Sequence, residues 1–228
     1  MSSRPIRPAT VLAAAADLVL PTVCGGCGAP GVRWCARCTR RLADDPVQLR
    51  PRIPVGAPVW ALGRYRGPHR AGLVALKEHG RRDLVDPFAD ALSRAVVTLA
   101  RWGEVPDARR LQLVPAPTRR AAARRRGGDP VTAMGLGVRQ RLGPRVVVNP
   151  MLVTTALTRD SAGLDAPARA RNVAGSIRIR RHAAPLAGSV RTILLDDVLT
   201  TGATAAQSHR VLAGSGVHVD LVLVVAGA

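Results

Sequence analysis

Near its carboxyl end the chain reads Thr192-Ile193-Leu194-Leu195-Asp196-Asp197-Val198-Leu199-Thr200-Thr201-Gly202-Ala203-Thr204. An apolar run typical of a strand is followed by two acidic residues, a turn of small residues and a helical segment at residues 203–213. A loop that enters the amino end of a helix points backbone N–H groups and the positive end of the helix dipole toward an anion. We therefore expect a phosphate-binding loop, preceded by carboxylates that suit the hydroxyl groups of a sugar.

This order of residues is shared with a known family. Residues 193–204 resemble the phosphoribosyl-pyrophosphate (PRPP) loop of type I phosphoribosyltransferases, and the whole chain resembles the ComF family of that superfamily. The resemblance implies that Asp196 and Asp197 are catalytic residues that hold the ribose hydroxyls, and that Mg²⁺ arrives with PRPP. The loop that would hold the 5′-phosphate consists of Val198, Leu199, Thr200, Thr201, Gly202, Ala203 and Thr204. The alternative is a threonine-rich turn that binds no ligand.

The composition limits how the protein could bind other molecules. Aromatic residues make up only 2% of the chain, which argues against base stacking as a main binding mode. The formal net charge is +19, and Lys77 is the only lysine, so nearly all the positive charge is arginine. This charge favours nucleic acid as a partner. Alternatively, the arginines reflect the codon bias of a GC-rich genome.

The amino terminus superficially resembles a signal peptide, because arginines precede an apolar run at residues 11–16. Asp17 interrupts that run, and Val23 is bulky where a cleavage site needs a small residue, so we expect an amphipathic helix instead. No run approaches the roughly 18 apolar residues that cross a bilayer. We expect a soluble, cytoplasmic protein.

Two C-x-x-C pairs contain all the cysteines of the chain: Cys24, Cys27, Cys35 and Cys38. Four thiolates in two such pairs favour a structural zinc ion with no open coordination position. Two disulfides or a redox C-x-x-C are the alternatives, although a cytosolic chain should keep its thiols reduced. The ComF family carries the same kind of four-cysteine module ahead of its transferase domain. We expect three parts: an amino-terminal helix and zinc module (residues 1–45), a proline-rich linker (46–58) and a phosphoribosyltransferase-like domain (59–228).

Several segments of the larger part resemble other ComF site elements. The strand at residues 111–117 precedes an arginine-rich loop, in which Arg119 and Arg126 would grip the pyrophosphate. A solvated basic turn or a nucleic-acid patch is the alternative, and Gly128-Asp129-Pro130 departs from the family pattern on the acceptor side. Residues 158–173 resemble a catalytic lid containing Arg169, or else form an ordinary surface loop. Lys77 is either a phosphate contact or a cation at a helix end.

The remaining patterns predict the fold. Residues 73–77, 85–99 and 131–142 have helical spacing, whereas strands are expected at residues 59–65, 145–153, 176–180, 191–195 and 217–225. Apolar strands that alternate with helices predict an α/β fold: a mainly parallel sheet with helices on both faces. A ligand should then bind at the carboxyl ends of the strands.

Two functions follow from these patterns. The first is transfer of a phosphoribosyl group from PRPP to an unidentified acceptor, with release of pyrophosphate. The second is a non-catalytic accessory of DNA uptake or DNA processing, which uses the same fold as a binding module and contacts other competence or DNA-processing proteins. A third possibility is a nucleic-acid binder that depends on its zinc.

Overall fold

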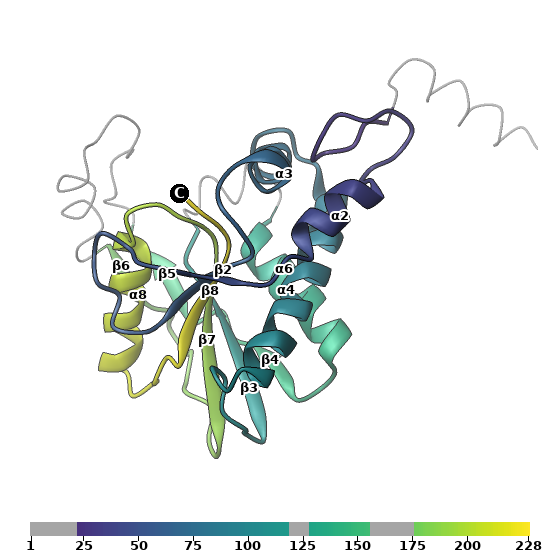
Figure 1. Cartoon of the computed structure of the whole chain (residues 1–228). Helices are drawn as coiled ribbons and strands as arrows, with labels where there is room; N and C mark the ends of the chain where they lie inside the picture. Colours follow the sequence, from purple (N-terminus) through teal and green to yellow (C-terminus); the bar gives the residue numbers. More distant parts are fainter. Residues whose placement is uncertain (1–21, 119–127, 156–175) are drawn as a thin grey trace, which may run out of the picture.

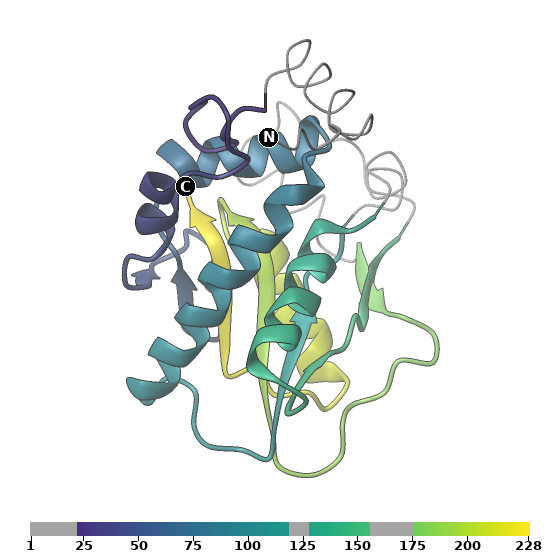
Figure 2. The same ribbon diagram turned by 90° about the vertical axis from the view of Figure 1, so that its right-hand side faces the viewer.

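A computed structural model describes residues 22–118, 128–155 and 176–228 (Figures 1 and 2). Its centre is a six-stranded sheet in the order β1-β2-β8-β7-β3-β4. Every neighbouring pair is parallel except β1 and β2. The strands are β1 (Val47–Leu49), β2 (Val59–Ala61), β3 (Arg110–Pro115), β4 (Val146–Val148), β7 (Val190–Leu199) and β8 (Leu221–Gly227). The mainly parallel α/β sheet is therefore confirmed.

Helices cover both faces of the sheet, as expected. Figure 1 shows α8 on one side, and Figure 2 shows α4 and α6 lying across the other. The helices are α2 (Ala36–Leu42), α3 (Gly67–Glu78), α4 (Val85–Arg101), α6 (Pro130–Leu142) and α8 (Ala203–Gly214), and a 3₁₀ turn, η1 (Arg82–Leu84), precedes α4. Alternate side chains of β7 enter separate cores: Leu195 packs with α4 and α6, and Leu194 packs with α8. A strand buried on both faces needs a continuous apolar run, which β7 has.

Several predicted strands have different limits in the structure, and β7 extends four residues beyond the predicted 191–195. Residues 145–153 form two strands, β4 and β5 (Leu152–Thr154), and β5 pairs with β6 (Ile177–Ile179) in a separate antiparallel ribbon. Pro150 lies between them and has no N–H for a ladder. The last strand begins at Leu221 rather than residue 217, because the Val217 N–H donates back to the Leu212 carbonyl at the end of α8. The strand at residues 59–65 ends at Ala61.

The segment expected as a linker takes part in the sheet. Its residues Val47–Leu49 form the edge strand β1. Further along, the Ile53 N–H donates to the Thr201 carbonyl over 3.0 Å, so this segment packs on the loop after β7. Among the helices described, none combines the length and the apolar character needed to span a bilayer.

Candidate functional site

The loop after β7 is built around Gly202. This residue has φ +90°, a left-handed conformation that favours glycine, and it caps the amino end of α8. A Cβ atom there would lie 2.9 Å from the Ile53 carbonyl oxygen, so there is no space for a side chain either. The Thr201 hydroxyl accepts a hydrogen bond from the Ala203 N–H at 3.4 Å. The glycine and the threonine therefore fix the turn that leads into the helix.

A small cavity lies within this loop. Its volume is about 40 Å³, and it is lined by Asp196 and by residues 198–205. The first N–H groups of α8 have no partner within the helix, and the dipole adds positive potential at the same end. A cavity needs only about 10–15 Å³ to hold one water molecule, so this space takes a small anionic group but is too small for a nucleobase. The cavity therefore suits a phosphate group.

Asp196 and Asp197 lie within β7, not in the loop after it. The Asp197 N–H donates to Asp196 Oδ1 at 2.8 Å. Asp196 borders the loop cavity, while Asp197 Oδ2 lies 2.7 Å from Lys77 Nζ. The two carboxylates therefore face different surroundings, although they are neighbours in the sequence.

Strand geometry accounts for this divergence, because successive side chains of a strand point to opposite faces of the sheet. The register of β7 with β8 stays constant through the aspartates, from Ile193 opposite Leu221 to Leu199 opposite Gly227. Asp196 and Asp197 are therefore directed to the two different faces of the sheet.

The surroundings of Asp196 change its ionisation. Burial raises the pKa of its carboxyl to about 7, and the charge of Asp197 contributes to the rise. The hydrogen bond from the Asp197 N–H and the charge of Lys77 oppose it. Asp196 is therefore a proton-bearing group near neutral pH, whereas a surface aspartate would be fully ionised.

Lys77 occupies the last turn of α3 and is partly exposed. The sequence offered two interpretations of it, a phosphate contact or a cation at a helix end. Its position agrees with the second, and its ion pair with Asp197 was not predicted. A contact with phosphate stays a prediction.

Asp129 organises the loop after β3, and its role was missed from the sequence. It caps α6 by accepting from the Val131 N–H at 3.2 Å. It also accepts from the hydroxyls of Thr118 and Thr132 at 2.8 and 2.6 Å. Thr118 and Asp129 lie on either side of residues 119–127, so this hydrogen bond joins the two described segments that flank them. An aspartate directly before a proline at a helix start was the available signal.

Some predicted site residues lie outside the described part of the chain. They are Arg119 and Arg126 of the arginine-rich loop, Arg169 with the rest of residues 158–173, and the amino-terminal helix. The structure brings together, by contrast, the Asp196–Asp197 pair, Lys77 and the loop of residues 198–204.

The four cysteines form the second candidate site. Their sulfur atoms all lie within 4.8 Å of one another, with 3.7 Å between Cys24 and Cys38 and 3.6 Å between Cys27 and Cys35. Zinc bonded to four thiolates at about 2.3 Å in a tetrahedron requires sulfurs about 3.8 Å apart. A disulfide requires about 2.05 Å, and all four cysteines are free. The cluster fits a four-coordinate metal ion such as zinc.

Hydrogen bonds within the cluster favour thiolates at two of the four positions. The Ala29 N–H and the Arg37 side chain lower the pKa of Cys27 to about 6. Burial opposes ionisation of Cys24, but hydrogen bonds from the backbone of Gly26 and Cys35 lower its pKa on balance. Burial raises the pKa of Cys38. A bound cation would supply the charge that lets this last thiol ionise as well.

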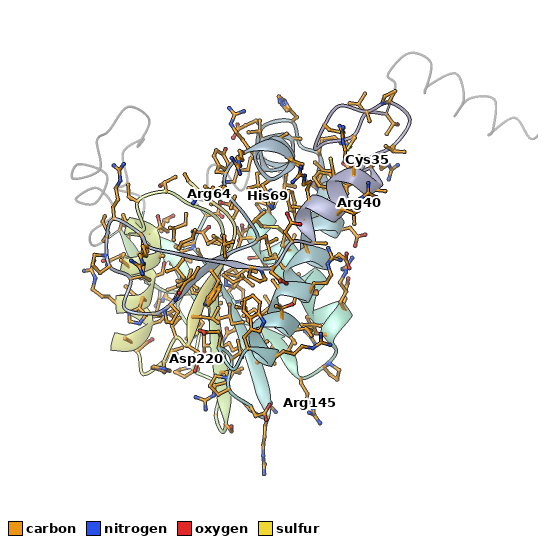
Figure 3. All side chains as sticks on the ribbon, in the orientation of Figure 1. Cys35, Arg40, Arg64, His69, Arg145 and Asp220 are labelled. Carbon is orange, nitrogen blue, oxygen red and sulfur yellow. The ribbon has the colours of Figure 1, made fainter. Side chains whose placement is uncertain are left out.

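The cysteine cluster packs tightly on the α/β core. A Cβ atom at Gly25 would lie 2.5 Å from Leu84 Cδ1. The ring of Trp34 packs against Phe88 of α4, with 5.7 Å between the ring centres. Figure 3 labels Cys35, which directly precedes α2, and Arg40, which lies in the last turn of that helix. The cysteine module and the sheet domain therefore share a packed seam.

Comparison with known proteins adds no identity to this description. No protein-family model matches the chain, and no curated protein matches its sequence.

Proposed function

We propose that this protein binds PRPP at the end of β7 and acts as a phosphoribosyltransferase with the type I fold. One observation carries the proposal: the carboxylate of Asp196 borders the same small cavity that is formed by the loop at the amino end of α8. A phosphate site with a carboxylate beside it suits a phosphorylated sugar, because the helix end attracts the anion and the carboxylate accepts from hydroxyls. The resemblance of residues 193–204 to the PRPP loop supports the same ligand.

The residues then divide the work. The loop of residues 200–204 holds the 5′-phosphate through backbone N–H groups and hydroxyls. Asp196 and Asp197 accept hydrogen bonds from the ribose, and the charge of Asp197 stabilises the positive charge that develops on the ring as pyrophosphate leaves. Lys77 holds Asp197 in place through their ion pair. Mg²⁺ enters as part of the substrate and neutralises the leaving pyrophosphate.

Calorimetry with PRPP and Mg²⁺ tests this proposal. Thr204→Val keeps the shape of the loop residue but removes a hydroxyl, so we expect about tenfold weaker binding. Thr98→Val is the matched control, because Thr98 is also a partly buried helical threonine but lies in α4. Equal affinity in both variants and the wild type would refute the site, as would the absence of any binding.

We also propose a structural zinc ion at the four cysteines. The supporting observations are the spacing of the sulfurs and the hydrogen bonds that favour thiolates at Cys24 and Cys27. With four protein ligands there is no open position for catalysis. Elemental analysis of the purified protein should give one zinc per chain, and oxidised cysteines without zinc would refute the assignment.

A non-catalytic role beside nucleic acid is the second candidate function. The net charge of +19 favours it, because a basic surface binds phosphate backbones by releasing counterions. The two functions differ in one measurable product: the enzyme releases pyrophosphate from PRPP when a cell extract supplies acceptors, whereas the binding module does not.

A further inference from the structure

Arg81 connects the cysteine module to the candidate PRPP site. It follows α3 by three residues, and its backbone N–H donates to the Ala75 carbonyl of that helix at 3.1 Å. The same carbonyl accepts from the His79 N–H at 3.2 Å. These bonds fold Arg81 back onto the turn of α3 that carries Lys77, so that the backbone positions of the two residues are coupled.

The guanidinium group of Arg81 holds both arms of the metal-binding loop. Nη1 donates to the Val23 carbonyl at 3.0 Å, directly before Cys24. Nη2 donates to the Arg33 carbonyl at 3.3 Å, two residues before the second cysteine pair. The Gly25 N–H donates to that same Arg33 carbonyl at 3.0 Å, so the two arms also bond to each other.

Asp83 sets the direction of this guanidinium group. Its two oxygens accept from Arg81 Nε at 2.9 Å and from Nη2 at 2.7 Å. Such a two-point contact fixes a planar guanidinium more firmly than a single bond does. The fork therefore leaves Nη1 and Nη2 aimed at the two carbonyls.

The last turn of α3, which Arg81 holds through its backbone, also contacts the aspartates. Lys77 Nζ lies 2.7 Å from Asp197 Oδ2, and α3 packs on the same side of the sheet as that carboxylate. An ion pair at this distance weakens steeply when one partner moves by a few ångströms. The position of α3 thus determines how strongly the charge of Lys77 interacts with the aspartates.

We propose that Arg81 is a positioning residue, which docks the end of α3 on the cysteine module and thereby holds Lys77 against Asp197. The inference rests on the proposed PRPP site for its functional meaning, but the ion pair can be tested without PRPP. It gives the cysteine module a role in the site, although no cysteine contacts the aspartates.

The test measures the ionisation of the aspartates in the metal-loaded protein, with metal content checked for each variant. Carbon-13 NMR of labelled aspartate carboxyls, assigned through Asp196→Asn, gives the apparent pKa of Asp196 without ligand. In Arg81→Gln we expect this pKa to rise by about half a unit or more, because Lys77 is then no longer held close to the aspartates and its charge stabilises the ionised form less. Arg81→Lys should restore part of the shift. Arg94→Gln is the control, since Arg94 also pairs with an aspartate but on the outer part of α4.

Asp83→Asn gives a second route if Arg81→Gln fails to fold. It disturbs the direction of Arg81 without removing its charge or its bonds to the carbonyls, so we expect a smaller rise in the same sense. If Arg81→Gln folds and the pKa of Asp196 is unchanged, the proposal is overturned, even if thermal stability falls. If Arg81→Gln does not fold, an unchanged pKa in Asp83→Asn overturns it instead. Failure of the wild type to bind PRPP, by contrast, would refute the proposed function only. The pKa measurement would still decide whether Arg81 positions Lys77.

Discussion

The cysteine cluster and the site at the end of β7 are assembled in opposite ways. All four sulfurs come from one short segment, residues 24–38, whose two C-x-x-C turns bring them within 4.8 Å of one another. The second site combines Lys77 of α3 with the aspartates of β7 and the loop before α8, which are far apart in the sequence. A local site depends on the chemistry of its own residues, whereas a composite site depends on the packing that brings its parts together. Substitutions in the two sites should therefore differ in how much they destabilise the protein and in which contacts they disrupt.

Loss of a metal ligand should have the largest effect. Cys38 is fully buried in the cluster, so Cys38→Ser removes one of four thiolates and leaves the others without a complete metal shell. We expect loss of bound zinc and a fall of roughly 4 kcal/mol or more in the free energy of unfolding. Elemental analysis and chemical denaturation measure the two effects. Thr39→Ser, at the exposed neighbouring position, serves as the control, and a stable Cys38 variant would contradict a structural metal site.

Gly202→Ala should have the next largest effect, and it tests the composite site. The alanine would have to adopt a left-handed φ of +90°, and its Cβ atom would lie 2.9 Å from the Ile53 carbonyl oxygen. Gly216→Ala is a matched control, since its φ of +80° is similar but nothing lies within 4 Å of the added Cβ. The left-handed conformation alone costs about 1–2 kcal/mol, and we expect the contact to add about 1–2 kcal/mol at Gly202. Equal losses at the two positions would mean that the linker does not press on this loop.

The sequence predicted the local site more completely than the composite one. The C-x-x-C spacing was sufficient for the cysteine cluster, because ligands within one short segment need no long-range information. The strand, the loop and α8 were also predicted, since apolar runs and a glycine between threonines are local signals. The pairing of Lys77 with Asp197 was not predictable, because it depends on how α3 packs over the sheet.

Gly72→Ala probes the seam that joins the two regions and should have a moderate effect. A Cβ atom at this position in α3 would lie 2.8 Å from Phe88 Cζ and 3.0 Å from Trp34 Cζ3. We expect a loss of about 1–2 kcal/mol in the free energy of unfolding, because ring displacement outweighs the better helix propensity of alanine. Gly214→Ala, in the last turn of α8 with nothing within 4 Å, should be neutral or slightly stabilising. A neutral Gly72 variant would imply a loose seam.

Asp196→Asn should have the smallest effect, and that effect should depend on pH. The pKa of Asp196 is raised to about 7 from an ordinary value of about 3.8, so between these values the folded protein holds more protons than the unfolded chain. The contribution of Asp196 to the free energy of unfolding should therefore fall as the pH rises from about 4 to about 7, and it should stay lower above that range. The asparagine variant cannot ionise, but its side-chain oxygen can still accept from the Asp197 N–H.

The difference between the two proteins isolates this group from all other titrating residues. Below pH 4 the wild type and Asp196→Asn should be nearly equally stable. Above pH 7 the variant should be more stable by roughly 1–2 kcal/mol, less than the ~4 kcal/mol that a three-unit shift implies, because water reaches this partly exposed site. Urea denaturation at a series of pH values gives both curves. A constant difference across that range would show that Asp196 ionises like a surface aspartate. The composite site would then differ from the cysteine cluster only in how its parts are packed together. A gain confined to neutral and higher pH would mean that the composite site sacrifices stability to keep a carboxylate beside its phosphate loop.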